Sequence, residues 1–269
     1  MTKTFIFIDG SYFIFYRYYA LLNWWKHSKQ ETPPCLENKE FLDKFEKLFL
    51  EKIKELKKKL KIKDASLLVA KDCPRSEIWR NTVYSNYKST RDSDGLETVG
   101  ACFKYVYANN LFQKGGCDKL LSHPGLEADD CIALFTKHIT NTVPDGVVYI
   151  IASDADYAQL KCPEINIINL KYKSIINNKT IFEDGKKSLF CKIVSGDKSD
   201  NIPPIIPKCG IKTAIKYYEN PELFHELLEN TPTAKQQFLL NKKIIDFNEI
   251  PEGLKSEFYE KQINCSTVF

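Results

Sequence analysis

Five short apolar runs are spread along the chain, and helical patterns separate them. They are Thr4–Ile8, Ser66–Ala70, Lys119–Leu121, Val147–Ala152 and Ile165–Leu170. Their length and continuous hydrophobicity predict strands that are buried on both faces, as in parallel sheets. Because strands that alternate with helices form crossover units, the sequence predicts an α/β fold with a mainly parallel sheet and helices on both faces.

The segments between these runs carry the spacing typical of helices. We expect helices at Ser11–Lys26, over the apolar repeat from Phe41 to Leu60, and at about Leu96–Gln113. The C-terminal third carries no further strand pattern and is expected to be helical. A turn punctuated by Gly and Pro leads there into a helix at Ile211.

Composition excludes several classes of protein. The 269 residues are 43% hydrophobic and 28% charged with a net charge of +4, so one large or two small domains can bury a substantial core. Nine cysteines without a C-x-x-C pair and only four histidines argue against zinc and for buried thiols in a reducing compartment. Asp9 and Arg17 interrupt the apolar N-terminus, so we expect an intracellular, soluble protein without a signal peptide or membrane anchor.

Three acids gather where the third expected strand gives way to a helix. After Pro124-Gly125 the chain reads L-E-A-D-D, which places Glu127, Asp129 and Asp130 in the opening turn of that helix. Acids there complement the helix dipole, but one would be enough for that purpose, and three repel one another. By itself, the cluster leaves charge compensation and a metal site equally open.

Further acids follow the other expected strands or come shortly after the sheet. These are Asp9, Asp72, Asp154, Asp156, Asp197 and Asp200. Ligands of open parallel sheets bind beyond the carboxyl ends of the strands, so we expect these acids to meet in one cleft. Clustered carboxylates without His or Cys select Mg²⁺ or Mn²⁺, and this number suits two ions that clamp a phosphodiester. The alternative, that individual acids are helix caps or surface charges, leaves their common position unexplained.

A basic and aromatic segment follows the second expected strand. Arg80, Lys88 and Arg91 could reach over the same cleft, and Tyr87 stands among them. Positive charge there would balance the negative charge that builds on a phosphate during its cleavage. Ordinary surface solvation is the alternative.

Five motifs made of these residues form a recognisable pattern. They are I-D-G-S-Y at Ile8–Tyr12, Y-K-S-T-R at Tyr87–Arg91, L-E-A-D-D at Leu126–Asp130, S-D-A-D at Ser153–Asp156 and G-D-K-S-D-N-I-P at Gly196–Pro203. Together they resemble the flap endonuclease or 5′-nuclease family, which includes the N-terminal nuclease domain of bacterial DNA polymerase I and free-standing phage enzymes. The match spans about residues 4–218, and five motifs in the family's order are highly specific.

The resemblance implies an architecture. We expect a PIN-like three-layer α/β/α core over residues 1–187, with a gateway segment at about 75–111, and a helical region at 188–269 packed on the core. That region would contain a helix-three-turn-helix motif that grips duplex DNA. Because the gateway segment is short, a complete arch around a threaded 5′ strand stays open.

The resemblance also implies roles for single residues. The first metal ion would be held by Asp9, Asp72, Glu127 and Asp129, and the second by Asp154, Asp156 and Asp197. Asp130 and Asp200 would lie nearby or act through water. Lys88 and Arg91 would contact the scissile phosphate and, with Asp9 and Asp72, form the expected catalytic set. Phe15 or Tyr16 would stack on a base near the cut, with core packing as the alternative.

The turn before Ile211 departs from the family pattern. Relatives usually have P-G-I-G-x-K-T-A, whereas this chain has P-K-C-G-I-K-T-A, so only the second glycine remains. Gly210 can still open a helix whose backbone N–H groups hold a phosphate. The candidate DNA contacts here are Lys208, Gly210, Lys212, Thr213 and Lys216. A monovalent cation, which relatives often bind through carbonyls of this turn, stays open.

The expected function follows from the resemblance. It is a divalent-metal-dependent 5′→3′ exonuclease and structure-specific 5′-flap endonuclease that acts on DNA flaps, nicks and ends, with RNA–DNA hybrids as further substrates. It would act as a monomer, with two Mg²⁺ or Mn²⁺, leave 5′-phosphates, and serve replication and repair. A haloacid dehalogenase-type phosphatase would need an Asp where Ser11 stands, and a proofreading 3′-exonuclease an Asp-x-Glu on the first strand. A non-catalytic DNA-binding protein with a degenerate nuclease site remains the rival.

Overall fold

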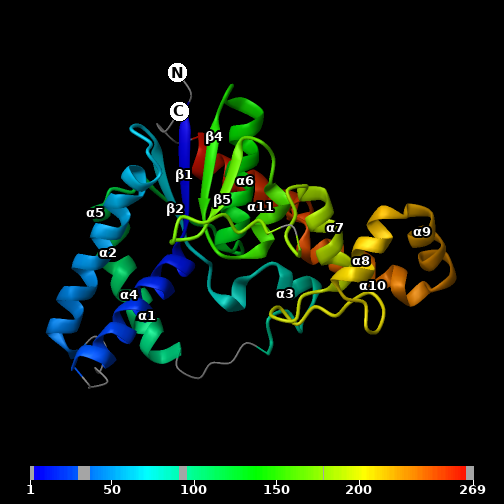
Figure 1. Ribbon diagram of the computed structural model, residues 1–269, viewed down its shortest axis with the longest axis horizontal. Coiled ribbons are helices and arrows are strands. Elements are labelled where there is room, and N and C mark those ends of the chain that lie inside the picture. Colours follow the sequence, from blue (N-terminus) through cyan, green and yellow to red (C-terminus); the bar gives the residue numbers. More distant parts are fainter. Residues whose placement is uncertain (1–2, 30–36, 91–95, 178, 265–269) are drawn as a thin grey trace.

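A five-stranded parallel sheet forms the centre of the computed structural model, which describes residues 3–29, 37–90, 96–177 and 179–264 (Figure 1). The strands are β1 (Thr4–Asp9), β2 (Ser66–Ala70), β3 (Lys119–Leu121), β4 (Val147–Ile151) and β5 (Ile165–Ile168). They lie in the order β3-β2-β1-β4-β5, and every neighbouring pair is parallel. The predicted strands and sheet type are confirmed, with ends that differ by at most two residues.

Alternate residues of β1 face two separate cores. Phe5 and Phe7 belong to one apolar cluster, and Ile6 and Ile8 belong to the other. The first cluster is covered by α6 (Ala128–Thr142) and α11 (Glu252–Tyr259), and the second by α1 (Gly10–Lys29), α2 (Lys39–Lys59), α4 (Leu96–Ala108) and α5 (Leu111–Gly115). Helices cover both faces of the sheet, which explains why its strands are mostly apolar, and the predicted three-layer α/β/α architecture is confirmed.

One helix prediction needs correction. The single helix expected at about Leu96–Gln113 is two helices, α4 and α5, because the chain turns between them. Asn110 stands at the turn with a φ of 52°, in the left-handed region that Asn tolerates better than most residues. In the sequence, the Asn109-Asn110 pair is the feature that could have indicated this turn.

The C-terminal part is helical, as predicted, and extends to one side of the sheet (Figure 1). Its helices are α7 (Gly185–Ser195), α8 (Ile211–Glu219), α9 (Pro221–Asn230) and α10 (Pro232–Ile245). They share an apolar cluster that includes Cys191, Val194 and Ala214. The proposed boundary after residue 187 stays a prediction. Among the described helices, none has the length and apolar character needed to cross a membrane.

Candidate active site

Carboxylates from several strand ends converge on one cavity of about 640 Å³. Asp9 ends β1 and pairs in register with Ala70, and Asp72 comes two residues after Ala70. Asp154 follows β4 by three residues. The carboxylates that line the cavity are Asp9, Asp72, Glu127, Asp129, Asp154 and Asp197. The structure thus brings together acids that are up to 188 positions apart in the chain.

Asp9 and Asp72 are fixed by hydrogen bonds at the tips of β1 and β2. The Tyr12 N–H and the Tyr157 hydroxyl donate to Asp9, at 2.9 and 3.0 Å. Asp72 accepts the Ala128 N–H at 2.8 Å, so it also caps the beginning of α6. Gly10 lets α1 start directly after β1, because a Cβ at this position would lie 2.5 Å from the Ala70 carbonyl oxygen.

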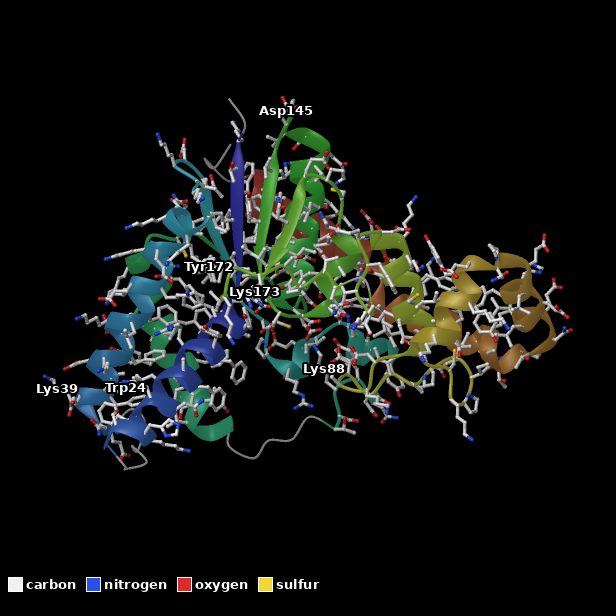
Figure 2. All side chains as sticks on the ribbon, in the orientation of Figure 1. Trp24, Lys39, Lys88, Asp145, Tyr172 and Lys173 are labelled. Atoms are coloured by element: carbon white, nitrogen blue, oxygen red, sulfur yellow. The ribbon has the colours of Figure 1, made fainter. Side chains whose placement is uncertain are left out.

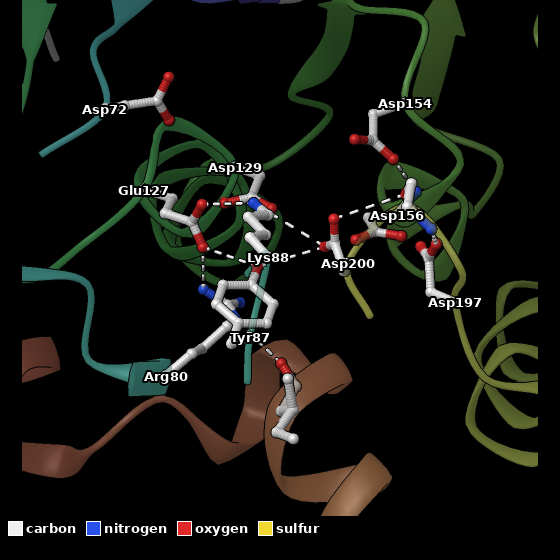
Figure 3. Close-up of polar contacts among 12 residues, drawn as sticks. Asp72, Arg80, Tyr87, Lys88, Glu127, Asp129, Asp154, Asp156, Asp197 and Asp200 are labelled. Carbon is white, nitrogen blue, oxygen red and sulfur yellow. Dashed lines mark hydrogen bonds and ion pairs between the residues drawn. The ribbon is translucent and has the colours of Figure 1, made fainter. Parts of the chain in front are cut away.

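Lys88 enters the cavity beside the acids at the start of α6. Its Nζ lies 2.5 Å from Glu127 Oε1 and 3.8 Å from Asp200 Oδ2, and it is one of the lining residues (Figure 3). The ammonium therefore lies in the cavity among the acids, and its contact with the scissile phosphate stays a prediction. Arg91, its expected companion, lies outside the described residues.

Arg80 does not reach over the cleft. The predicted contact of Arg80 with DNA therefore has to be corrected. Its side chain is 2% exposed and donates to Glu127 at 3.0 Å, to both oxygens of Asp130 at 2.8 and 2.7 Å, and to the Ile244 carbonyl at 2.8 Å. Asp130, which is fully buried, also accepts the Trp79 Nε1–H at 3.0 Å. Both oxygens of Asp130 are thus engaged within the protein, and Asp130 is not among the residues that line the cavity.

Tyr87 is also directed inward, so the contact with DNA expected for it does not fit its position. The side chain is buried, and its hydroxyl lies 2.9 Å from Glu127 Oε2 and 3.3 Å from Asp200 Oδ2. The ring packs beneath the Lys88 ammonium, at 4.8 Å from the ring centre. Arg80 and Tyr87 therefore support Glu127 and Lys88 from inside the protein (Figure 3).

A second group of acids lies beside the cavity, and Asp197 is the member of this group that lines it. Lys192, a residue that the sequence analysis did not single out, contacts this group. Oxygens of Asp156, Asp197 and Asp200 come within 4.8 Å of one another. Lys192 Nζ contacts Asp156 and lies 2.7 Å from Asp197. Burial by itself would raise the pKa of Asp197, but the Lys192 ammonium outweighs burial and lowers this pKa to about 2. The only signal in the sequence was the position of Lys192 one helical turn before Gly196-Asp197.

Burial and mutual repulsion shift the pKa values of the acids. Burial, followed by the charge of Asp72, raises the pKa of Asp9 to about 7. Burial and the neighbouring acids raise the pKa of Asp129 well above its usual value. Burial would also raise the pKa of Glu127, but Lys88 and Arg80 outweigh it and lower that pKa. A divalent cation relieves such repulsion, and a donor set made only of carboxylates fits Mg²⁺ or Mn²⁺.

The expected DNA contacts lie around this cavity and along α8. Phe15 lines the cavity, with its ring 5.1 Å from that of Phe103, whereas Tyr16 is partly buried beside Tyr12. Lys208 and Gly210 line a second cavity of about 680 Å³. Lys212 and Lys216 are exposed one turn apart on α8, and Thr213 between them is partly buried. The DNA contacts expected for these residues stay predictions.

Comparison with known proteins identifies the family. Residues 4–186 match the model of the 5′-3′ exonuclease N-terminal resolvase-like domain. Two solved structures of phage T5 proteins, D15 with metal ions and the 5′-exonuclease with zinc, have TM-scores of 0.68 at 16% and 17% identity, covering 96% of this chain and 97% of those chains. The bacteriophage T5 D15 flap endonuclease in a pseudo-enzyme–product complex with DNA and metal ions gives the same TM-score and coverage at 16% identity.

Comparison with curated protein sequences gives no match. At these identities the T5 structures establish a shared fold. The family model covers more than half of the chain and establishes membership in the family. The chain therefore belongs to the family of 5′-3′ exonucleases that carry this N-terminal resolvase-like domain.

Proposed function

We propose that the protein is a divalent-metal-dependent nuclease that degrades DNA from 5′ ends and cuts 5′ flaps. One observation carries the proposal: six carboxylates from separate segments line a single cavity together with Lys88. Membership in the 5′-3′ exonuclease family supports the reaction. The similar T5 flap endonuclease, whose structure contains DNA and metal ions, supports the substrate and the cofactor.

The donor set fits two Mg²⁺ or Mn²⁺ ions. Asp9, Asp72, Glu127 and Asp129 would hold the first ion, and Asp154, Asp156 and Asp197 the second, with Asp200 close to both groups. Asp130 is better assigned to holding Arg80, since both of its oxygens are engaged there. When bound, such ions supply Lewis-acid stabilisation of phosphate oxygens and lower the pKa of an attacking water.

Side chains at the cavity would position the scissile phosphate and the bases beside it. The Lys88 ammonium would bind a phosphate oxygen, where positive charge favours the negative charge that develops in the transition state. Phe15 offers a ring at the cavity wall on which a base could stack. Arg91 stays a proposed phosphate contact. The products would carry 5′-phosphates.

The helical region would hold the duplex. The turn at Lys208 and Gly210 opens α8, whose first N–H groups and exposed Lys212 and Lys216 suit the phosphates of a DNA backbone. We propose this unit, with Thr213, as the helix-three-turn-helix motif. RNA–DNA hybrids as substrates, a monomeric state and a role in replication and repair belong to the same proposal.

Incubation of a labelled 5′-flap duplex with Mg²⁺ or with EDTA tests the proposed function. We expect cleavage only with the metal, products with 5′-phosphates, and loss of cleavage but not of duplex binding in Asp9→Asn and Asp154→Asn variants. Binding of the flap without cleavage in Mg²⁺ or Mn²⁺ would contradict the proposal and support a non-catalytic DNA-binding protein.

A further inference from the structure

A short hairpin between α7 and α8 carries two acids of the second group, Asp197 and Asp200, and is fixed at both ends. Asp197 and Ile202 exchange backbone hydrogen bonds of 2.8 and 2.7 Å. Gly196 precedes the hairpin with a φ of 71°, and a Cβ there would lie 2.4 Å from the Ile202 carbonyl oxygen. The Asn241 side chain donates to the Pro203 carbonyl just after the hairpin, at 2.8 Å. The Asp197 hairpin (residues 197–202) is therefore a stiff element.

The Asp197 hairpin grips the turn that carries Lys88 (residues 84–89). The Lys88 N–H donates to the Asp200 carbonyl at 2.9 Å. Asn201 Nδ2 donates to the Asn86 carbonyl at 3.0 Å and to Ser89 Oγ at 2.9 Å. These bonds hold the backbone on both sides of Lys88, although the two segments are more than 100 residues apart in the chain.

The backbone of Lys88 has an unusual conformation, which the hydrogen bonds from the hairpin stabilise. Its φ is 55°, a left-handed conformation that costs free energy for a lysine, and Asn201 has a φ of 60°. A residue held in a sparsely populated conformation persists only where its surroundings enforce it. In that conformation the Lys88 side chain reaches Glu127 at the cavity.

We propose that Asn201 is a positioning residue that holds the Lys88 turn against the second group of acids, an inference that rests on the proposed function. Asp197 begins the hairpin and Asn201 lies four residues later. A cation bound by Asp197 would fix the hairpin further, and the hairpin in turn holds the Lys88 ammonium over the cavity. The placement of the phosphate-binding lysine is thereby coupled to the second metal site.

Two variants remove the Asn201 side-chain hydrogen bonds of this grip without straining the backbone. Asn201→Gly tolerates the positive φ and removes both side-chain hydrogen bonds, while Asn201→Asp keeps the shape and loses the N–H donors. Asp145→Gly is the matched control, because Asp145 also has a positive φ, 55°, and lies far from Lys88, at the top of the view just before β4 (Figure 2). This control excludes a general effect of Gly at a left-handed position.

Single-turnover cleavage of a 5′-flap duplex in Mg²⁺ tests the positioning role. We expect Asn201→Gly and Asn201→Asp to lower the rate about tenfold, since a small displacement of a catalytic group is costly, while duplex affinity changes less than about twofold. In a Lys88→Ala background, Asn201→Gly should have no further effect. Additive losses, a loss confined to affinity, or an unchanged rate in either variant would overturn the proposal.

Hydrogen exchange of the Lys88 amide provides a readout that is independent of cleavage. In the wild-type protein, Mg²⁺ should slow exchange of this amide about tenfold relative to EDTA, and in Asn201→Gly the effect of Mg²⁺ should vanish. Equal protection in both proteins would refute the coupling. If the wild type cuts no DNA, the proposed function fails; if it cuts DNA and Asn201 has no effect, only this inference fails.

Discussion

Arg80 provides the sharpest test of how the cavity is built, because it is a buried cation between two buried acids. The side chain donates four hydrogen bonds, three of them to Glu127 and Asp130. Arg80→Met removes the charge and leaves Asp130, which has no exposed surface, with only the Trp79 and Glu127 N–H groups as donors. An unpaired buried charge of this kind costs about 3–5 kcal/mol.

Urea unfolding in EDTA measures this cost. For a chain of this length, with a slope of about 2.5 kcal/mol per M, the midpoint of Arg80→Met should fall by about 1–2 M. Arg80→Met/Asp130→Leu should be more stable than Arg80→Met alone, because it removes the buried charge that the single substitution leaves behind. Lys114→Met, which disrupts only an exposed ion pair with Glu46, should change stability by less than about 0.5 kcal/mol.

A small effect would refute this account of Arg80. If Arg80→Met lost less than about 1 kcal/mol, or if the double variant were no more stable than the single one, the ion pair with Asp130 would not support the start of α6. The inward position of Arg80 would then have to be explained without this pair.

The remaining predictions concern the acids, Lys88 and α8. The raised pKa of Asp9, about 7, means that ionisation of this buried acid destabilises the metal-free fold increasingly between about pH 4 and 7. Asp9→Asn should therefore stabilise the protein in EDTA by a few kcal/mol at pH 8 but not at pH 4. Urea unfolding at the two pH values measures this difference. Lys88→Ala should slow single-turnover cleavage more than it weakens DNA binding; a change in affinity alone would contradict its role. Lys212→Ala and Lys216→Ala should each weaken duplex binding at all DNA sequences and leave the single-turnover rate unchanged. Each should also lower the slope of the logarithm of the binding constant against the logarithm of the salt concentration by about one.

The arrangement of the sheet and its acids followed from local patterns. The apolar runs around Phe5 and Val148 are continuous because both faces of the sheet are covered, and that continuity marks a parallel sheet. The carboxyl ends of parallel strands lie on one edge, so residues just past them, such as Asp72 and Asp154, were expected to meet. Periodicity and topology were enough for this part.

The directions of single side chains could not be predicted in the same way. Arg80 and Tyr87 are residue types that are common on DNA-binding surfaces. However, the short helix α3 (Arg80–Val83) packs near α10, where the Ile244 carbonyl accepts the Arg80 Nε–H. The inward position therefore depends on a contact between residues 164 positions apart. The contact of Lys192 with Asp156 has the same origin, since it depends on how α7 packs beside the segment after β4.

The central claim is that acids from distant segments hold two divalent ions in one cavity. Anomalous diffraction from crystals soaked in Mn²⁺ tests this claim most directly. We predict two peaks in the cavity, one among Asp9, Asp72, Glu127 and Asp129, and one among Asp154, Asp156 and Asp197. Crystals that take up Mn²⁺ elsewhere, or show no peak beside these carboxylates, would contradict the account.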